Sequence, residues 1–214
     1  MVASEDKKTR NKIIVMVAAL LAVAATILFL IMYIFARNRD SNSIGFNGGE
    51  YIMTVENGNH DPTIWSILFD NESKTFTETV KAGSIDSVLD QGTFTYDETQ
   101  NKIYKRGKNG TEETLIVYGQ YLIVDNYLFE GSSISGDKLN GTYSYKNNDG
   151  ITYSAVFRDD GTFSYNSDMM IPVQGTYKVQ NGVIKMQPDN GTTLVDFLIY
   201  NNSKLSNSYY VKNE

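Results

Sequence analysis

Residues 159–186, "DDGTFSYNSDMMIPVQGTYKVQNGVIKM", contain a glycine-threonine-aromatic motif twice, at residues 161–163 and 175–177. The motif occurs twice more, at residues 92–94 and 141–143. Short stretches around these motifs alternate aromatic or β-branched residues with polar ones, and Asp-Gly and Asn-Gly pairs supply the positive φ of tight hairpins. This pattern is typical of an antiparallel meander. We expect each glycine to start a strand, each threonine to suit the pleat, and each aromatic side chain to point into a core.

The motifs belong to an internal repeat of roughly 80–90 residues. The segment "GGEYIMTVENG" (48–58) corresponds to "NGTYSYKNNDG" (140–150), and "QGTFTYDETQNKIYKR" (91–106) corresponds to "QGTYKVQNGVIKMQ" (174–187). Each copy offers about six or seven strands, enough for a small barrel, and closing a sheet removes its exposed edges. We therefore predict an all-β ectodomain of two tandem antiparallel modules, at residues 49–132 and 137–213. A single larger barrel built from both copies is the alternative.

The second copy, "GTY…VF-DDGTF…GTYKV…VIKM…LSN", resembles the small lipocalin-like domains of bacterial envelope proteins. The resemblance covers residues 139–206 well and 49–124 less well, because the first copy has "FDNESKTF" in place of a glycine turn and a longer middle loop. It implies lipocalin-like barrels in a bacterial cell envelope. It implies no ligand-binding residues, because that family has no fixed functional positions.

Residues 13–36 form an apolar run of 24 residues without a charge. A spanning helix needs about 20 such residues, whereas the apolar region of a cleaved signal peptide, the alternative, is only about 7–15 residues long. We predict a retained transmembrane α-helix at 13–36, a tail at 1–12 and a linker at 37–48. The small side chains of Ala18, Ala22 and Thr26 share one face of this helix, where another helix could pack.

Basic residues are biased toward the N-terminal side of this run. Because Lys and Arg favour the cytoplasmic side of a membrane, we predict a cytoplasmic N-terminus and an extracellular C-terminal part. The basic residues before the run are Lys7, Lys8, Arg10 and Lys12, and those closely after it are Arg37 and Arg39.

Composition excludes several classes of function. The chain has 19 basic and 25 acidic residues, with no basic stripe, so nucleic acid is not an expected partner. It has no cysteine and a single histidine, His60, with no nucleophile elbow and no zinc-ligand spacing. The acidic segments at 159–161 and 189–191 have the composition of turns. We predict no enzyme activity, no metal and no cofactor.

Two equivalent middle loops, at residues 78–91 and 166–174, are the candidate partner-binding surface. They carry apolar side chains in connections between strands, and "SIDSVLD" (84–90) has the pattern of one or two helical turns. Either these loops bind a partner or they plug the barrels. We expect a non-catalytic membrane protein that binds a protein partner or scaffolds an envelope assembly; the alternative is a carrier or sensor of a small apolar ligand or lipid. The candidate residues are Met169, Met170, Ile171 and Val173 in one loop and Ile85, Val88 and Leu89 in the other.

Overall fold

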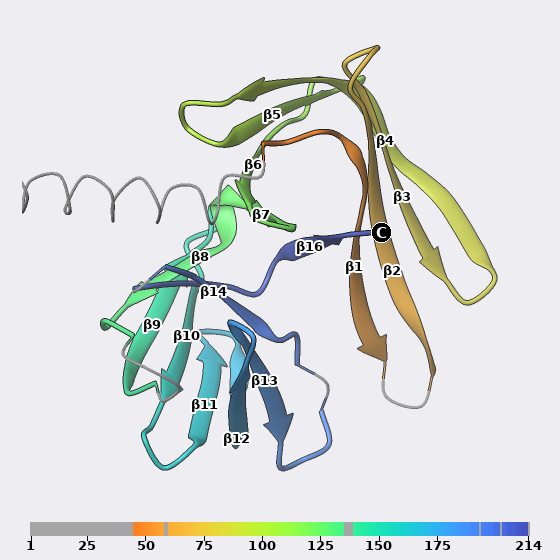
Figure 1. Cartoon of the computed structure of the whole chain (residues 1–214). Coiled ribbons are helices and arrows are strands. Elements are labelled where there is room, and N and C mark those ends of the chain that lie inside the picture. The colour runs from red at the N-terminus through yellow and green to blue at the C-terminus, as the bar shows by residue number, and fades with distance from the viewer. Residues whose placement is uncertain (1–44, 58–59, 135–138, 193, 202, 214) are drawn as a thin grey trace, which may run out of the picture. The chain divides into compact units, whose positions relative to one another are not determined.

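The computed structural model describes residues 45–57, 60–134, 139–192, 194–201 and 203–213. This part of the chain is all-β and forms two closed antiparallel barrels of eight strands each (Figure 1). The prediction of two modules in place of one larger barrel is confirmed. The described residues contain no helix that is long and apolar enough to cross a membrane. The helix predicted at 13–36, with Ala18, Ala22 and Thr26, lies outside the described residues.

The first barrel has the strand order β1-β16-β7-β6-β5-β4-β3-β2. Seven of its strands follow one another along the chain, each paired with the next, and the eighth comes from the far end of the sequence. The strands are β1 (Gly49–Asn57), β2 (His60–Asp70), β3 (Thr75–Ala82), β4 (Ile85–Asp97), β5 (Lys102–Gly107), β6 (Glu112–Tyr118), β7 (Tyr121–Val124) and β16 (Tyr209–Lys212).

The second barrel has the order β10-β11-β12-β13-β14-β15-β8-β9, so its eight strands are consecutive in the chain and the barrel closes where β15 pairs with β8. A short 3₁₀ helix, η1 (Asp125–Tyr127), leads from β7 into the first of these strands, β8. The strands are β8 (Leu128–Gly131), β9 (Gly141–Lys146), β10 (Thr152–Phe157), β11 (Thr162–Ser167), β12 (Met170–Gln180), β13 (Val183–Pro188), β14 (Phe197–Asn201) and β15 (Lys204–Ser206).

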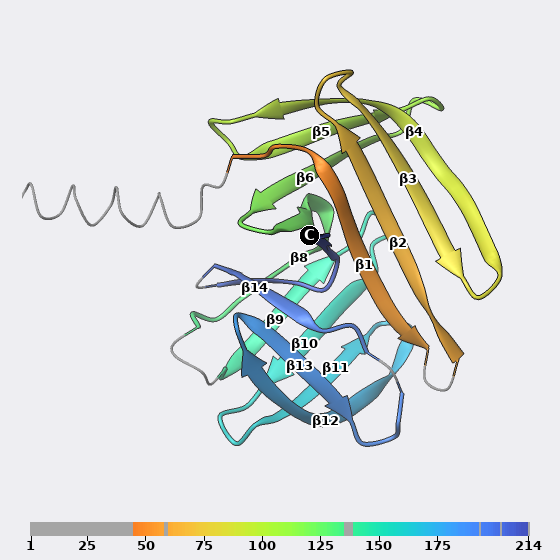
Figure 2. The same cartoon turned by 45° about the vertical axis from the view of Figure 1, so that its right-hand side comes forward.

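The two repeats exchange their last strands. β8 follows the first seven strands but pairs with β9 and β15, and β16 follows the second set of seven but pairs with β1 and β7 (Figures 1 and 2). The expected module limits, 49–132 and 137–213, thus differ from barrel membership at these two short strands. The reason is that β8 and β16 reach their partners across the repeat boundary, which local pattern does not specify.

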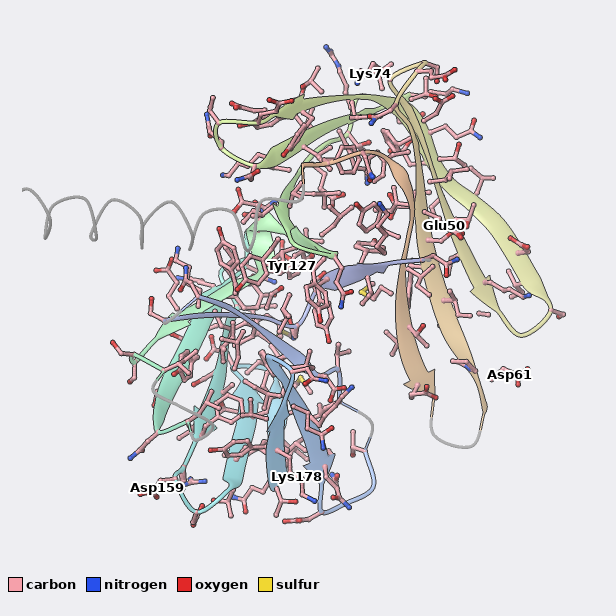
Figure 3. The ribbon with its side chains drawn as sticks, in the orientation of Figure 1. Glu50, Asp61, Lys74, Tyr127, Asp159 and Lys178 are labelled. Atoms are coloured by element: carbon pink, nitrogen blue, oxygen red, sulfur yellow. The ribbon has the colours of Figure 1, made fainter. Side chains whose placement is uncertain are left out.

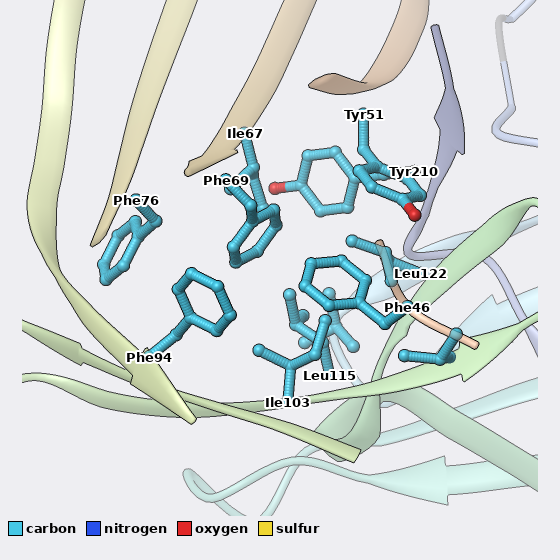
Figure 4. Packing of buried hydrophobic residues seen from close by; sticks show 12 residues of the cluster. Phe46, Tyr51, Ile67, Phe69, Phe76, Phe94, Ile103, Leu115, Leu122 and Tyr210 are labelled. Atoms are coloured by element: carbon cyan, nitrogen blue, oxygen red, sulfur yellow. The ribbon is translucent and has the colours of Figure 1, made fainter. Parts of the chain in front are cut away.

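The repeated motif fills the two cores. Its four aromatic residues are all buried, as predicted, in two clusters that each occupy one barrel (Figure 4 shows the first). Around Phe94, the rings of Phe46 and Phe69 pack edge-to-face at centroid distances of 5.7 and 5.0 Å, an arrangement that aromatic pairs favour. The motif aromatics are Phe94, Tyr143, Phe163 and Tyr177.

Two of the four motif glycines do not start a strand. Gly141 and the turn at Gly161 do so, but Gly92 lies inside β4 and Gly175 inside β12. A Cβ at Gly92 would lie 2.0 Å from the carbonyl oxygen of Arg106, and one at Gly175 would lie 2.2 Å from that of Gln187. At these positions glycine permits the close approach of the next strand, a recognised use of glycine inside a sheet.

A third buried cluster lies outside both barrel interiors. It joins Ile116 of β6 and Ile123 of β7 to Val183 of β13 and Leu198 of β14. Their neighbours Leu115, Leu122, Ile184 and Phe197 point into the two cores, so strand alternation turns these four side chains outward. The two barrels are therefore connected by apolar contact as well as by the exchanged strands.

Candidate functional site

The first predicted loop is a projecting β-hairpin. Residues 85–90 belong to β4 and pair with β3, from Ala82 opposite Ile85 to Glu78 opposite Asp90. The helical turns expected at 84–90 are therefore wrong. Gly83, at φ +56°, allows the two-residue turn, and cross-strand pairing then favours the extended conformation over a short isolated helix. Leu89 is the extra residue of a β-bulge at the base of this arm.

The second predicted loop is the equivalent, shorter arm between β11 and β12. Ser167 pairs with Met170, so Asp168 and Met169 form the turn and Ile171 continues β12. Val173 is buried in the core of the second barrel and so does not belong to an exposed surface. The other predicted residues do not plug the barrels, because their side chains are between 45% and 88% exposed: Ile85, Val88, Leu89, Met169, Met170 and Ile171.

A cleft of about 770 Å³ is a site that the sequence reasoning missed. One wall is formed by β1 and β16 and another by β13 and the segment that follows it. The pattern of aliphatic residues in β1 and β13 predicted these strands. Nothing in the local sequence indicated that each strand would lack a paired strand on the side that faces the cleft. The lining residues are Ile52, Met53, Thr54, Val55, Glu56, Lys185, Met186, Gln187, Pro188, Gly191, Thr192, Leu194, Val195, Asp196, Tyr209 and Val211.

A buried charge cluster lies on the inward face of the first barrel. Lys105 is only 4% exposed, and its Nζ lies 2.8 Å from Oε2 of Glu78 and 2.8 Å from Oε2 of Glu113. Burial alone lowers the pKa of Lys105, but the carboxylates of Glu113 and Glu78 outweigh it, so the pKa is raised and the ammonium stays charged. The hydroxyl of Tyr210, from the exchanged strand β16, lies 3.4 Å from Oε1 of Glu78. The cluster thus ties β3, β5, β6 and β16 together.

The described part of the chain contains no candidate metal site. There, no group of three or more His, Asp or Glu side chains is arranged to hold a metal ion. Asp159 lies at the turn between β10 and β11 (Figure 3), and the carboxylate of Asp160 accepts hydrogen bonds from the amide (2.9 Å) and hydroxyl (2.6 Å) of Thr162. His60 begins β2, paired with Asn57. Asp160 therefore stabilises the turn between β10 and β11.

Comparison with known proteins gives no further assignment: no protein-family model, no curated protein and no solved structure matches the chain. The fold and the exposed features above are the basis for assigning a function.

Proposed function

We propose that the chain is a non-catalytic, single-pass membrane protein whose two barrels bind a protein partner on the outer side of the cell membrane. The observation that carries this proposal is the pair of equivalent arms, β3–β4 and β11–β12, whose apolar side chains are exposed while clusters of buried apolar residues occupy the barrel interiors. Exposed apolar patches mark interaction sites, and methionine is common where a surface adapts to a partner. The lipocalin-like resemblance and a place in a bacterial cell envelope belong to the same proposal.

The alternative, a carrier of a small apolar ligand, has less support. An eight-stranded barrel has room for either its own side chains or one small ligand. Here both interiors hold clusters of large residues, among them Phe69, Phe76 and Phe94 in the first barrel and Phe129, Phe157 and Phe197 in the second. This packing favours binding on the outside of the barrels.

Native mass spectrometry of the full-length protein, gently solubilised from its own membrane, tests the proposal. We expect added protein subunits, lost in the variants Ile85→Ser/Val88→Ser and Met170→Ser/Ile171→Ser. Leu68→Ser is the matched control, because Leu68 is an exposed leucine (52%) away from both arm tips and its loss should leave the complex intact. An added mass of a few hundred daltons without subunits would favour the carrier instead.

Membrane orientation has its own test, which uses the absence of cysteine from the chain. A single cysteine replacing exposed Asp159 should react with a membrane-impermeant maleimide in intact cells, whereas one replacing Ser4 should react only after lysis. The reverse pattern would contradict the proposed topology.

A further inference from the structure

The cleft lined by β1 and β13 contains an unpaired strand edge. β1 pairs with β2 from Gly49 to Asn57, but with β16 only at Tyr51 and Ile52. Beyond this point the two strands diverge, so the segment Met53–Asn57 has a neighbour on one side only. A strand rises about 3.3 Å per residue, so this open edge is roughly 13 Å long.

The backbone groups that face the cleft follow from strand geometry. The amide of Asn213 donates to the carbonyl oxygen of Glu50 at 2.9 Å, so the backbone groups of Glu50 point toward β16. Alternate residues of a strand direct their N–H and C=O to the same side, which places those of Ile52, Thr54 and Glu56 on this side as well. Ile52 has its partner in Val211, whereas Thr54 and Glu56 have no ladder partner among the described residues.

The opposite wall differs because a side chain already occupies its edge. β13 pairs with β14 only at Val183 and Ile184, which leaves Lys185–Pro188 without a strand on that side. Oδ1 of Asp196 accepts a hydrogen bond from the amide of Met186 at 3.0 Å, and Oδ2 lies 2.6 Å from Nζ of Lys185. The β13 edge is therefore capped, and the β1 edge is the one open to pairing.

We propose that the β1 edge accepts an extended peptide segment of a partner protein as an additional antiparallel strand. The backbone N–H and C=O groups along the open edge lack hydrogen-bond partners in a neighbouring strand. Only an extended polypeptide supplies a row of such partners at the matching spacing. Leu194, Val195 and Met186 give the cleft apolar contacts for alternate side chains of that segment. Because Lys185 is paired with Asp196, Glu56 is the unbalanced charge of the lining, which favours a Lys or Arg opposite it.

This surface is separate from the arms on which the proposed function rests, so the two can be tested independently. The Ile85→Ser/Val88→Ser and Met170→Ser/Ile171→Ser variants should leave binding at the β1 edge unchanged.

The test uses full-length protein in detergent micelles and a set of labelled, capped nonapeptides of alternating apolar residues and threonine, with a lysine at each end. Binding is followed by fluorescence anisotropy. We expect at least one member to bind, and its analogue N-methylated at alternate residues to bind at least tenfold more weakly, because methylation removes backbone donors and keeps the side chains. Replacing the terminal lysines by glutamate should also weaken binding.

Protein variants give the matching control. Thr54→Pro removes an amide that faces the cleft without removing a bond to β2, a position at which an edge strand tolerates proline. It should reduce peptide binding at least tenfold, whereas Thr54→Val, which keeps the amide, should not. If Thr54→Pro fails to fold, hydrogen exchange of the wild-type protein decides: peptide should slow exchange of the Thr54 and Glu56 amides at least tenfold.

Three results would overturn the proposal. In the first, no peptide of the set binds with a Kd below about 1 mM. In the second, the N-methylated analogue binds as well as its parent, which would mean that the cleft captures side chains without strand pairing. In the third, the protein dimerises in a manner abolished by Thr54→Pro, which would make a second copy of the chain the occupant.

Discussion

Two tyrosines of the repeated motif place their hydroxyl groups in opposite surroundings. The Tyr177 hydroxyl accepts a hydrogen bond from the amide of Leu139 at 3.0 Å and lies 2.9 and 2.8 Å from the carbonyl oxygens of Leu139 and Arg158. The Tyr143 hydroxyl is buried without a hydrogen-bond partner among the described residues. One hydroxyl connects a strand to two loops, and the other carries an uncompensated desolvation cost.

Replacing each of these tyrosines by phenylalanine should therefore affect stability differently. We expect Tyr177→Phe to lower the free energy of unfolding by about 1–3 kcal/mol, because it leaves the Leu139 amide unsatisfied. Tyr143→Phe should leave it unchanged or raise it by about 1 kcal/mol, because it removes a buried polar atom with no partner. Urea unfolding of both variants measures the difference, and equal losses would contradict this account.

Alkaline pH should destabilise the first barrel through Tyr51. Burial, with a smaller effect of Tyr96, raises the pKa of Tyr51 to about 12, from about 10 in an unfolded chain. Below pH 10 both states keep the proton and this contribution is fully present; between pH 10 and 12 the unfolded state ionises first, so stability falls. We expect Tyr51→Phe to reduce the loss at pH 12 by about 2 kcal/mol in urea titrations. If the free energy of unfolding of Tyr51→Phe falls with pH as steeply as that of the wild type, Tyr51 is not the group responsible.

At the scale of elements, the sequence predicts what local chemistry controls. Asp-Gly and Asn-Gly turns form where expected, with Gly150, Gly161 and Gly182 at positive φ, and the alternating segments form the strands between them. The first copy lacks a glycine in its β2–β3 turn, where Lys74 adopts φ 55° instead. Local chemistry does not specify which strand closes which barrel, because "LFEG" of β8 and "YYVK" of β16 are equally compatible with either sheet.

The same limit applies to the candidate surfaces. Apolar residues in two equivalent connections were predictable from the sequence, but whether they are exposed or plug the barrels was not. The strand conformation of 85–90 depends on pairing with β3, and burial of Val173 depends on the core of the second barrel. The open edge of β1 depends on where β16 diverges from it, a non-local event. The strand conformation of 85–90, the burial of Val173 and the open edge of β1 all depend on contacts between segments that are distant in the sequence.

Removing β16 should open one barrel and leave the other closed. In a chain that ends at Ser206, β1 and β7 lose their shared neighbour, whereas the second barrel keeps its eight strands. We expect hydrogen exchange to increase in β1 and β7 and to stay slow in β10–β12. A synthetic peptide of residues 207–214 should restore protection. Equal loss in both barrels would contradict the observed strand exchange.

At the scale of the whole molecule, the exchanged strands and the cluster around Ile116 and Leu198 should hold the two repeats together after the chain is cut. A protease site placed at residues 135–138 would separate β1–β8 from β9–β16. Each fragment still supplies one strand to the other's barrel, so we expect both to elute together in gel filtration and to separate only in denaturant. Fragments that separate without denaturant would show that the exchanged strands contribute little to holding the two repeats together.

The place of β16 in the first barrel also has a consequence for how the protein is made. Contacts of this strand's end join residues 163 and 165 positions apart. β7 ends at Val124 and β16 begins at Tyr209. At about 5–20 residues per second, a ribosome therefore spends roughly 4–17 s with the first seven strands complete and their barrel still open. A nascent chain halted between residues 124 and 209 leaves β1 and β7 each with one unpaired edge, a feature that distinguishes an unfinished product from a finished one.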